Sequence, residues 1–166
     1  AEGATDQDMR IATRAWEEGR ALVMVANKWD LRSTAAKTFV DDLRERYPSV
    51  TGVPVLTMSA QSGAGVDALL PAVRRVAAAH DIELQTARLN EALEAAVRAK
   101  EPPMAGGRRP RLFYATQIAR RPPTITVFTS APTAIHPSYH RYLQNRFTDA
   151  FRLTGTPVRV QFRGRR

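Results

Sequence analysis

Hydrophobic positions in the first part of the chain follow two patterns, one typical of helices and one typical of buried strands. Apolar residues at helical spacing begin after Thr5 and end at Gly19, and Thr5 with Asp8 predicts a capping box at the start of this helix. The continuous apolar run 21–26 predicts a strand buried on both faces, and residues 53–58 predict a second short strand. Strands that alternate with helices predict a parallel, doubly wound α/β sheet.

Two more helices are predicted in this part of the chain. Ser33 or Thr34 is expected to cap the first of them, whose Phe39, Leu43 and Tyr47 are expected to point inward. The second follows a glycine-rich turn and presents a wide apolar stripe, made of Val66, Leu69, Leu70, Val73, Val76 and Ala77. Because two parallel strands make a poor sheet by themselves, we expect residues 1–80 to be part of a larger domain.

A different pattern begins at Thr86. A helix with one apolar face ends before Pro102, two strand-like runs follow at 111–119 and 124–129, and a second helix starts near Pro137. The last strand alternates apolar with basic or polar residues, so one of its faces is predicted to be core and the other wet. The order α-β-β-α-β predicts an α+β unit, a three-stranded sheet with helices packed on one face.

Charge separates the same two parts, which we place at residues 1–80 and 81–166. The net charge is +9, and all of the excess lies in the second part, which holds fifteen Lys and Arg against six Asp and Glu. This asymmetry favours a polyanion partner, nucleic acid in preference to a membrane; a solvated surface with a frayed tail is the alternative. The arginines expected to contact phosphates, with little sequence specificity, are Arg108, Arg109, Arg111, Arg120, Arg121, Arg159, Arg163, Arg165 and Arg166.

Neither a metal site nor a membrane span is predicted. The sequence has no cysteine, which excludes disulfides and thiolate ligands and fits a reducing cytoplasm. No apolar run approaches the roughly 18 residues of a membrane-spanning helix. His136 and His140 stand four apart, as metal-binding pairs on a helix do, but no acidic partner lies nearby in the sequence. We therefore expect a capping or surface role for both.

The strongest chemical signal is the sequence Asn27-Lys28-Trp29-Asp30, which directly follows the run 21–26. Guanine offers its ring N–H and exocyclic amine as adjacent donors, which one carboxylate can accept together, and adenine offers no such pair. Asp30 is therefore the residue expected to select guanine. Asn27 is expected to bind the base and tie neighbouring loops, and the aliphatic stem of Lys28 is expected to cover the face of the base.

A second loop supports this hypothesis. The segment Thr57-Met58-Ser59-Ala60 leaves the second predicted strand. The Ala60 backbone N–H is therefore expected to meet the carbonyl oxygen of guanine, while Ser59 braces the loop. Two loops with ordinary turn residues are the alternative. A strand followed by N-K-x-D, and then a strand followed by S-A, resembles the base-binding half of a P-loop GTPase.

This resemblance narrows to one family, the bacterial double-G-domain GTPases of the Der (EngA) type. The segments similar to that family are Glu2-Gly3, Gln7 to Ala12, Asn27 to Leu31, Lys100 to Pro103, Leu112 to Gln117, Pro122-Pro123 and Tyr139 to Phe151. The family implies a GTPase of the bacterial cytoplasm that acts in large ribosomal subunit assembly, with two G domains packed around a C-terminal KH-like domain. Residues 1–80 then resemble the end of the second G domain, and residues 81–166 the KH-like domain.

The resemblance also implies ligands and partners. GTP or GDP, with Mg²⁺, is the expected nucleotide of the intact protein, and the large ribosomal subunit, rRNA and the other G domains are the expected partners. The chain contains no G-x-x-x-x-G-K-[ST] phosphate loop and no switch motif, lacks the features of a signal peptide, and is expected to start after switch II. We therefore expect GTP hydrolysis by the parent protein and none by this chain alone, so no catalytic residue is predicted.

Two functions remain open for the KH-like part. RNA-binding KH domains clamp the nucleic-acid backbone with a G-x-x-G loop, and no such loop lies between the predicted helices. The charge asymmetry favours contact with rRNA. The missing loop favours a protein-interaction module that docks on another domain without binding RNA.

Overall fold

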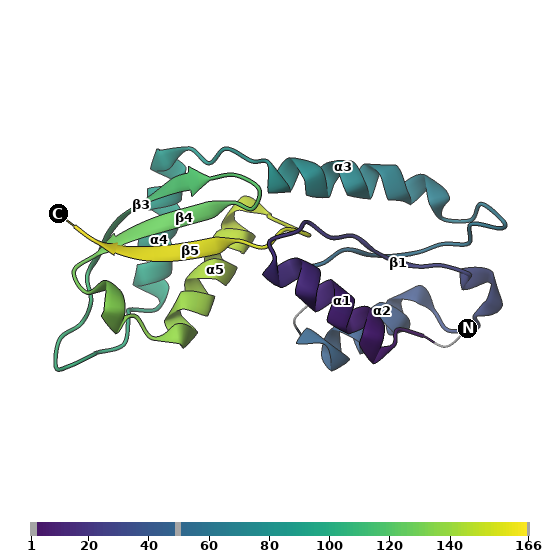
Figure 1. The fold of residues 1–166 in the computed structure, drawn as a ribbon, viewed down its shortest axis with the longest axis horizontal. Helices are drawn as coiled ribbons and strands as arrows, with labels where there is room; N and C mark the ends of the chain where they lie inside the picture. Colours follow the sequence, from purple (N-terminus) through teal and green to yellow (C-terminus); the bar gives the residue numbers. More distant parts are fainter. Residues whose placement is uncertain (1–2, 49–50, 166) are drawn as a thin grey trace. The chain divides into compact units, whose positions relative to one another are not determined.

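The chain folds into two compact units, each with its own small sheet (Figure 1). The computed structural model describes residues 3–48 and 51–165. Unit 1 contains Ala1–Ala79 and Thr154–Pro157, and unit 2 contains His80–Leu153 and Val158–Arg166. Each unit is described below by itself. The α/β and α+β classes predicted for the two parts are both found.

Unit 1 begins with helix α1 (Asp6–Glu17), whose capping box is confirmed. The Thr5 backbone N–H donates to the Asp8 carboxylate at 2.9 Å, and the Thr5 hydroxyl accepts from the Asp8 N–H at 3.3 Å. The bonds that Thr5 donates hold the pKa of Asp8 below its usual range, because they favour the charged carboxylate. Gly19 follows with a φ of 84°, a conformation that ends the helix.

Strands β1 (Met24–Ala26) and β2 (Val55–Thr57) pair in parallel, with Met24 opposite Val55. The prediction that the run 21–26 is buried on both faces is wrong, since Val25 is 38% exposed. Within the described residues β1 pairs with β2 alone, so no further strand covers its outer side. A continuous apolar run indicates a strand that has to be covered on both faces. In the described residues, β2 is the one strand that lies beside β1.

Helix α2 (Ala36–Arg46) starts later than predicted. Ala35 is its N-cap and provides no side-chain hydrogen bond, so the prediction of a Ser33 or Thr34 cap is wrong. The inward position of Leu43 is confirmed. Leu43 is buried in a small core with three residues of α1 and of the segment before β2, which are Met9, Ala12 and Val53.

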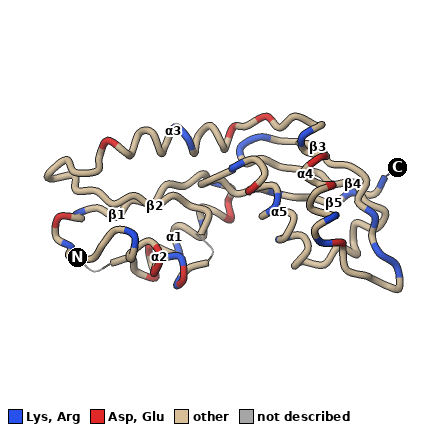
Figure 2. The backbone as a smooth tube through the Cα atoms, turned by 180° about the vertical axis from the view of Figure 1, so that it is seen from behind, with Lys and Arg blue, Asp and Glu red and all other residues tan. Residues whose placement is uncertain are grey.

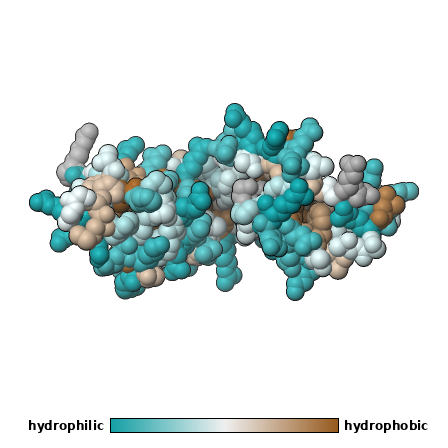
Figure 3. Space-filling model, turned by 90° about the horizontal axis from the view of Figure 1, so that it is seen from below, coloured by the Kyte–Doolittle hydropathy of each residue, from teal (hydrophilic) through white to brown (hydrophobic). Residues whose placement is uncertain are grey.

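Helix α3 (Leu69–His80) follows a short 3₁₀ turn and buries only Ala72 and Val76. Of the rest of the predicted apolar stripe, Leu69 is half-buried and the others are exposed, Leu70 by 65% and Val73 by 43%. Figure 3 shows one face of the molecule, on which hydrophilic residues predominate and hydrophobic ones form small separate patches. Val66 of the predicted stripe lies in the 3₁₀ turn and the other five residues lie in α3, and no second layer covers the exposed ones in the described part of unit 1.

The short segment Thr154–Pro157 contacts the residues that precede β1 and β2, and Gly155 makes these contacts. The Leu22 N–H donates to the Gly155 carbonyl at 2.7 Å, and the Gly155 N–H donates to the Gly52 carbonyl at 2.8 Å. The φ of Gly155 is +73°, and a Cβ at this position would lie 2.6 Å from Val76 Cγ2 and 2.8 Å from the Leu22 carbonyl oxygen. Only glycine fits this position without strain.

Unit 2 has the predicted order, α4 (Thr86–Ala99), β3 (Leu112–Ala119), β4 (Thr124–Thr129), α5 (Pro137–Phe151) and β5 (Arg159–Gly164). The sheet order is β3-β4-β5; β3 and β4 are antiparallel, and β4 and β5 are parallel. Both helices lie on the same face of the sheet (Figure 1). The core residues between the helices and that face are Leu89, Leu93, Ala115, Ile125, Val127, Tyr139, Leu143, Phe147 and Val160.

The outer edge of β3 is covered at its centre by a side chain of α4. The Ala115 N–H donates to Asn90 Oδ1 at 2.8 Å, and Asn90 Nδ2 donates to the Ala115 carbonyl at 3.1 Å. The amide of Asn90 therefore pairs with one residue of β3 as a neighbouring strand would. Its Nδ2 also donates to the Thr86 carbonyl at 2.7 Å, which fixes the amide on the helix.

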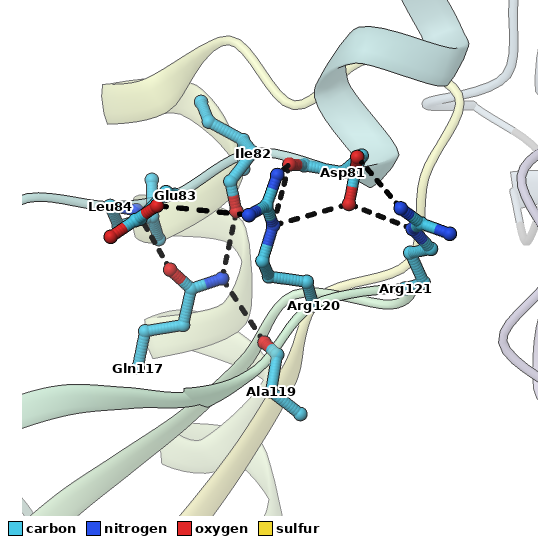
Figure 4. Close-up of polar contacts among 8 residues, drawn as sticks. All are labelled: Asp81, Ile82, Glu83, Leu84, Gln117, Ala119, Arg120 and Arg121. Carbon is cyan, nitrogen blue, oxygen red and sulfur yellow. Dashed lines mark hydrogen bonds and ion pairs between the residues drawn. The ribbon is translucent and has the colours of Figure 1, made fainter.

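Residues 80–84, which lead into α4, are held by a group of side chains from β3 and its turn that we call the clasp: Gln117, Arg120 and Arg121 together with Asp81 (Figure 4). Gln117 Nε2 donates to the Ile82 carbonyl at 3.0 Å, and Gln117 Oε1 accepts from the Leu84 N–H at 2.7 Å. Arg120 Nε donates to the Asp81 carbonyl at 2.9 Å. Residues 80–84 are therefore ordered by side chains about 35 residues further along the chain.

The carboxylate of Asp81 is the charged centre of the clasp. Arg121 donates to both of its oxygens, at 2.7 and 3.0 Å, and Arg120 Nε lies 3.1 Å from it. These bonds, that of Arg121 first, hold the pKa of Asp81 below its usual range. Arg120 and Arg121, in the turn between β3 and β4, are therefore both paired with one carboxylate.

We expect Gly155→Ala to lower the free energy of unfolding by about 2 kcal/mol or more, because it adds a steric clash to a positive φ. Gly63→Ala is the matched control, since its φ is +80° but a Cβ there would meet nothing within 4 Å. Urea denaturation measures both variants. An equal loss for the two would show that the clash at Gly155 is relieved.

We expect Asp81→Asn to lower the melting temperature at pH 7, because it removes the carboxylate that pairs with Arg120 and Arg121. The folded pKa of Asp81 lies below 3.8, so its stabilising effect is complete above pH 3.8 and is lost as the pH falls through the folded pKa. Thermal unfolding over a pH series should therefore show wild type and variant converging in acid. Asp149→Asn, which removes an exposed carboxylate from α5, should show no such difference at pH 7.

Candidate functional site

The candidate site of unit 1 lies where β1 and β2 end. Parallel strands end at the same edge of a sheet, so the loops that follow them meet there. Asn27 directly follows β1, and its Oδ1 accepts a hydrogen bond of 3.0 Å from the N–H of Ala60, 33 residues away. The structure thus brings the two predicted loops together, with Asn27 as the side chain that joins them.

The backbone turns sharply after Asn27. Lys28 has a φ of 58°, and Trp29–Leu31 form a 3₁₀ turn, η1. The N–H of Trp29 donates to the Met58 carbonyl at 3.0 Å, a second link between the loops. Asp30 is exposed on this turn, and its carboxylate has no partner in the part of the chain that the structure describes. An unpaired carboxylate beside Asn27 is chemically suited to accept from the two adjacent donors of guanine.

Ser59 holds the second loop, as predicted from the sequence. It is 1% exposed, its N–H donates to the Ala64 carbonyl at 2.9 Å, and its hydroxyl accepts from the Ser62 N–H at 3.3 Å. Gly65 completes the loop with a φ of +76°, and a Cβ there would lie 2.6 Å from the Thr57 carbonyl oxygen. The loop therefore closes tightly onto the end of β2.

The N–H of Ala60 differs from its expected state. The sequence predicts that it donates to guanine, whereas in the structure it donates to Asn27 Oδ1. A base contact through Ala60 requires that this bond lengthen or be shared. The other loop residues need no such change.

An aromatic and cationic cluster that the sequence analysis did not select supports the turn. The rings of Trp29 and Phe39 meet edge to face at 5.2 Å, and the guanidinium of Arg32 lies 5.7 Å from the first centroid and 5.1 Å from the second. The only sequence signal for this cluster is the proximity of one arginine to two aromatic residues. The contacts of this cluster hold Trp29, the residue between Lys28 and Asp30, in place, and Asp30 remains exposed.

A cavity of about 420 Å³ lies beside this cluster. Its lining is mostly apolar and includes residues of α1 and β1 together with Asn27 and Trp29, but not Asp30, Ser59 or Ala60. Asn27 is therefore the residue that this cavity shares with the residues predicted to bind guanine.

The predicted RNA-contacting arginines occupy two opposite ends of the unit 2 sheet. At one end Leu112, Thr129 and Gly164 lie side by side, and at the other end Ala119, Thr124 and Arg159 do. These rows are five residues apart on β4, roughly 17 Å at the usual rise of a strand. Figure 2 shows basic positions in the loop before β3 and beside the end of β5. The first end carries Arg108, Arg109, Arg111, Arg163 and Arg165, the second carries Arg120, Arg121 and Arg159, and Arg166 lies outside the described residues.

Acidic neighbours are distributed unequally between the two ends. Arg120 and Arg121 belong to the clasp with Asp81, and Arg120 Nη1 also lies 3.7 Å from Glu83. At the other end, Arg109 forms an ion pair with Glu101. Arg165 instead lies 5.7 Å from the ring centroid of Phe113. The arginines predicted to contact RNA therefore form two groups, which differ in how many carboxylates lie beside them.

The capping role expected for a histidine is confirmed for His136, whereas His140 is half-buried and contacts β5. His136 is the N-cap of α5, where its Nδ1 accepts from the Ser138 N–H at 3.2 Å, and His140 Nε2 lies 2.7 Å from the Val160 carbonyl. Among residues 3–48 and 51–165, no group of three or more His, Cys, Asp or Glu could hold a metal ion. None of the helices in the described ranges is long and apolar enough to cross a membrane.

Comparison with known proteins agrees with the fold. Residues 83–163 match a family model described as the KH-domain-like region of EngA bacterial GTPase enzymes, C-terminal. The chain is 46% identical to GTPase Der of Syntrophobacter fumaroxidans and 40% identical to GTPase Der of Geobacter metallireducens. Each match covers 99% of this chain, and the chain spans 38% of the length of each relative.

A solved structure of Era in complex with MgGDPNP and nucleotides 1506–1542 of 16S ribosomal RNA is also similar, with a TM-score of 0.39 and 14% identity over 98% of this chain and 61% of that chain. A likeness of this degree supports no argument about function. The two relatives and the family model agree with each other. The chain therefore belongs to the Der (EngA) family of bacterial GTPases, and its residues 83–163 form the KH-like domain of that family.

Proposed function

We propose that unit 1 recognises the guanine base of GTP or GDP for a GTPase that acts in assembly of the large ribosomal subunit. Asp30 accepts from the two adjacent donors of the base, Asn27 and Lys28 contact its edge and face, and Ser59 and Ala60 form the opposite loop. The observation that supports this most is the hydrogen bond between Ala60 and Asn27, because it joins two loops from distant parts of the sequence beside an unpaired carboxylate.

The proposed role of unit 1 does not include binding of the phosphates or of Mg²⁺. The sequence has no phosphate loop, and the described residues include no cluster that could hold a metal ion. A bound nucleotide would supply the γ-phosphate that is hydrolysed, and the residues of this chain would hold and select only its base. Hydrolysis is accordingly proposed for the parent protein, as the name of its relatives suggests, and not for this chain by itself.

We propose further that unit 2 contacts rRNA of the large ribosomal subunit in the cytoplasm. The support is its surplus of arginine, which attracts phosphates without sequence preference. A module that docks on another G domain of the same protein without binding RNA is the competing proposal. It is favoured by the absence of a G-x-x-G loop and by the pairing of Arg120 and Arg121 with Asp81.

We expect guanosine to shift the amide NMR signals of residues 27–30 and Ala60 with a dissociation constant on the order of 1 mM, and adenosine to leave them unchanged. Asp30→Ala should weaken guanosine binding about tenfold or more, because it removes two charge-assisted hydrogen bonds. Asp41→Ala, an exposed carboxylate on α2, is the charge-matched control. Equal shifts with both nucleosides would contradict the proposal for Asp30.

We expect the chain to bind purified large ribosomal subunits with an affinity that falls steeply as salt rises, because arginine–phosphate contacts release counterions. Sedimentation of the subunits with labelled chain across a salt series measures this slope. A flat slope would favour protein docking. No binding even at low salt would show that the chain alone does not carry the ribosome contact.

A further inference from the structure

One end of the unit 2 sheet presents a row of residues on the face opposite the helices. Ala115 and Val127 point into the core, so their neighbours Tyr114 and Phe128 point to the other face. Phe128 is also opposite Arg163 of β5, which is exposed. Tyr114, Phe128 and Arg163 therefore form a continuous row across all three strands.

The aromatic residues of this row are accessible. The rings of Tyr114 and Phe128 are stacked with centroids 4.4 Å apart and an angle of 19° between their planes, and Tyr114 is 40% exposed. Next to it, Phe113 is also 40% exposed, at a bulge in β3, with Arg165 over its ring. Exposed rings that gather at one end of a sheet form a candidate interaction surface, because contiguous exposed apolar patches mark binding sites.

The loop before β3 adds charge and a hollow. Arg108 and Arg111 are exposed, and neither forms an ion pair within the part of the chain that the structure describes. Together with Arg109 and Phe113 they line a hollow of about 720 Å³, whose other side is formed by Val97, Glu101 and Pro102 at the end of α4. That volume is within the range of sites that bind small molecules or single nucleotides.

The arginines at this end of the unit 2 sheet are not neutralised by carboxylates as those at the other end are. Arg120 and Arg121 share the Asp81 carboxylate, whereas among the described residues at this end only Arg109 has a carboxylate partner. Positive charge that is not neutralised by carboxylates therefore lies at the end of the sheet where the aromatic rings are exposed. Charge alone would suit any polyanion, and rings alone any apolar partner.

We propose that this surface, made of Arg108, Arg111, Phe113, Tyr114, Arg163 and Arg165, binds unpaired RNA nucleotides. The inference rests on the proposed contact of unit 2 with rRNA and assigns it a location and a form of RNA. Bases stack on the rings of Phe113 and Tyr114, and the arginines bind the phosphates on either side. A duplex keeps its bases stacked on each other and offers only phosphates, so single-stranded RNA fits this surface better.

Fluorescence anisotropy of the whole chain with a labelled, unstructured twelve-nucleotide RNA and with a duplex of the same length tests the proposal. We expect tighter binding of the single strand. Arg111→Ala with Arg163→Ala should weaken it about tenfold and reduce the slope of log affinity against log salt by about 1.4, since each lost phosphate contact accounts for about 0.7. Arg141→Ala with Arg146→Ala, which removes the same charge from exposed positions of α5, should change neither quantity appreciably.

Tyr114→Leu separates stacking from charge. It should weaken single-strand binding about tenfold, leave the salt slope unchanged and leave duplex binding unchanged. Thermal unfolding of each variant confirms that unit 2 remains folded, and Phe128→Leu, which removes the less exposed ring of the pair, provides a second variant if Tyr114→Leu unfolds.

Each other outcome overturns a distinct part of the proposal. If wild type binds RNA but the α5 control weakens it as much as the sheet variants, the location is wrong and the rRNA contact of unit 2 stands. If Tyr114→Leu has no effect or the duplex binds as tightly, stacking of unpaired bases is wrong. If the chain binds neither RNA but binds an acidic polyglutamate peptide, both the inference and the proposed rRNA contact are wrong.

Discussion

The parallel pairing of β1 with β2 is the constraint on which the candidate guanine site depends. Each strand has only three residues, yet their shared direction places Asn27 and Ser59 at the same edge of the sheet. The hydrogen bond from Ala60 to Asn27 and the one from Trp29 to Met58 then hold the two loops together. A shift of one residue in this register would turn Val25 and Leu56 to the opposite faces and would separate the loops.

In unit 2 the positions of six acidic residues have more influence on function than the number of basic ones. Asp81 lies beside the turn between β3 and β4, so it neutralises arginines at that end and orders the segment that leads into α4. The same total charge with Asp81 elsewhere would give two similar basic surfaces. Net charge therefore describes what the unit attracts, while the location of its carboxylates decides where contact is possible.

The sequence was sufficient for features that depend on local patterns. The capping box of Thr5, the order of the elements and the meeting of the two strand-end loops follow from spacing alone. Burial of the run 21–26 was not predictable, because it depends on strands that lie elsewhere. The same holds for the ion pair of Asp81 with Arg121, two residues 40 positions apart. Asn27 was expected to tie neighbouring loops, but the sequence did not predict that it does so through the Ala60 N–H, the donor expected to contact guanine. Propensity describes a residue and its close neighbours, whereas these features are set by tertiary contacts.

The amide of Asn90 has a consequence for how this chain behaves at high concentration. An exposed edge strand invites pairing with the edge of another molecule, which is the first step toward ordered aggregates. Asn90 occupies both backbone groups of Ala115 at the centre of β3, so an incoming strand finds its ladder interrupted after one or two bonds. A single polar side chain thus protects the molecule from self-assembly along this edge, while the rings and arginines of the neighbouring face stay accessible.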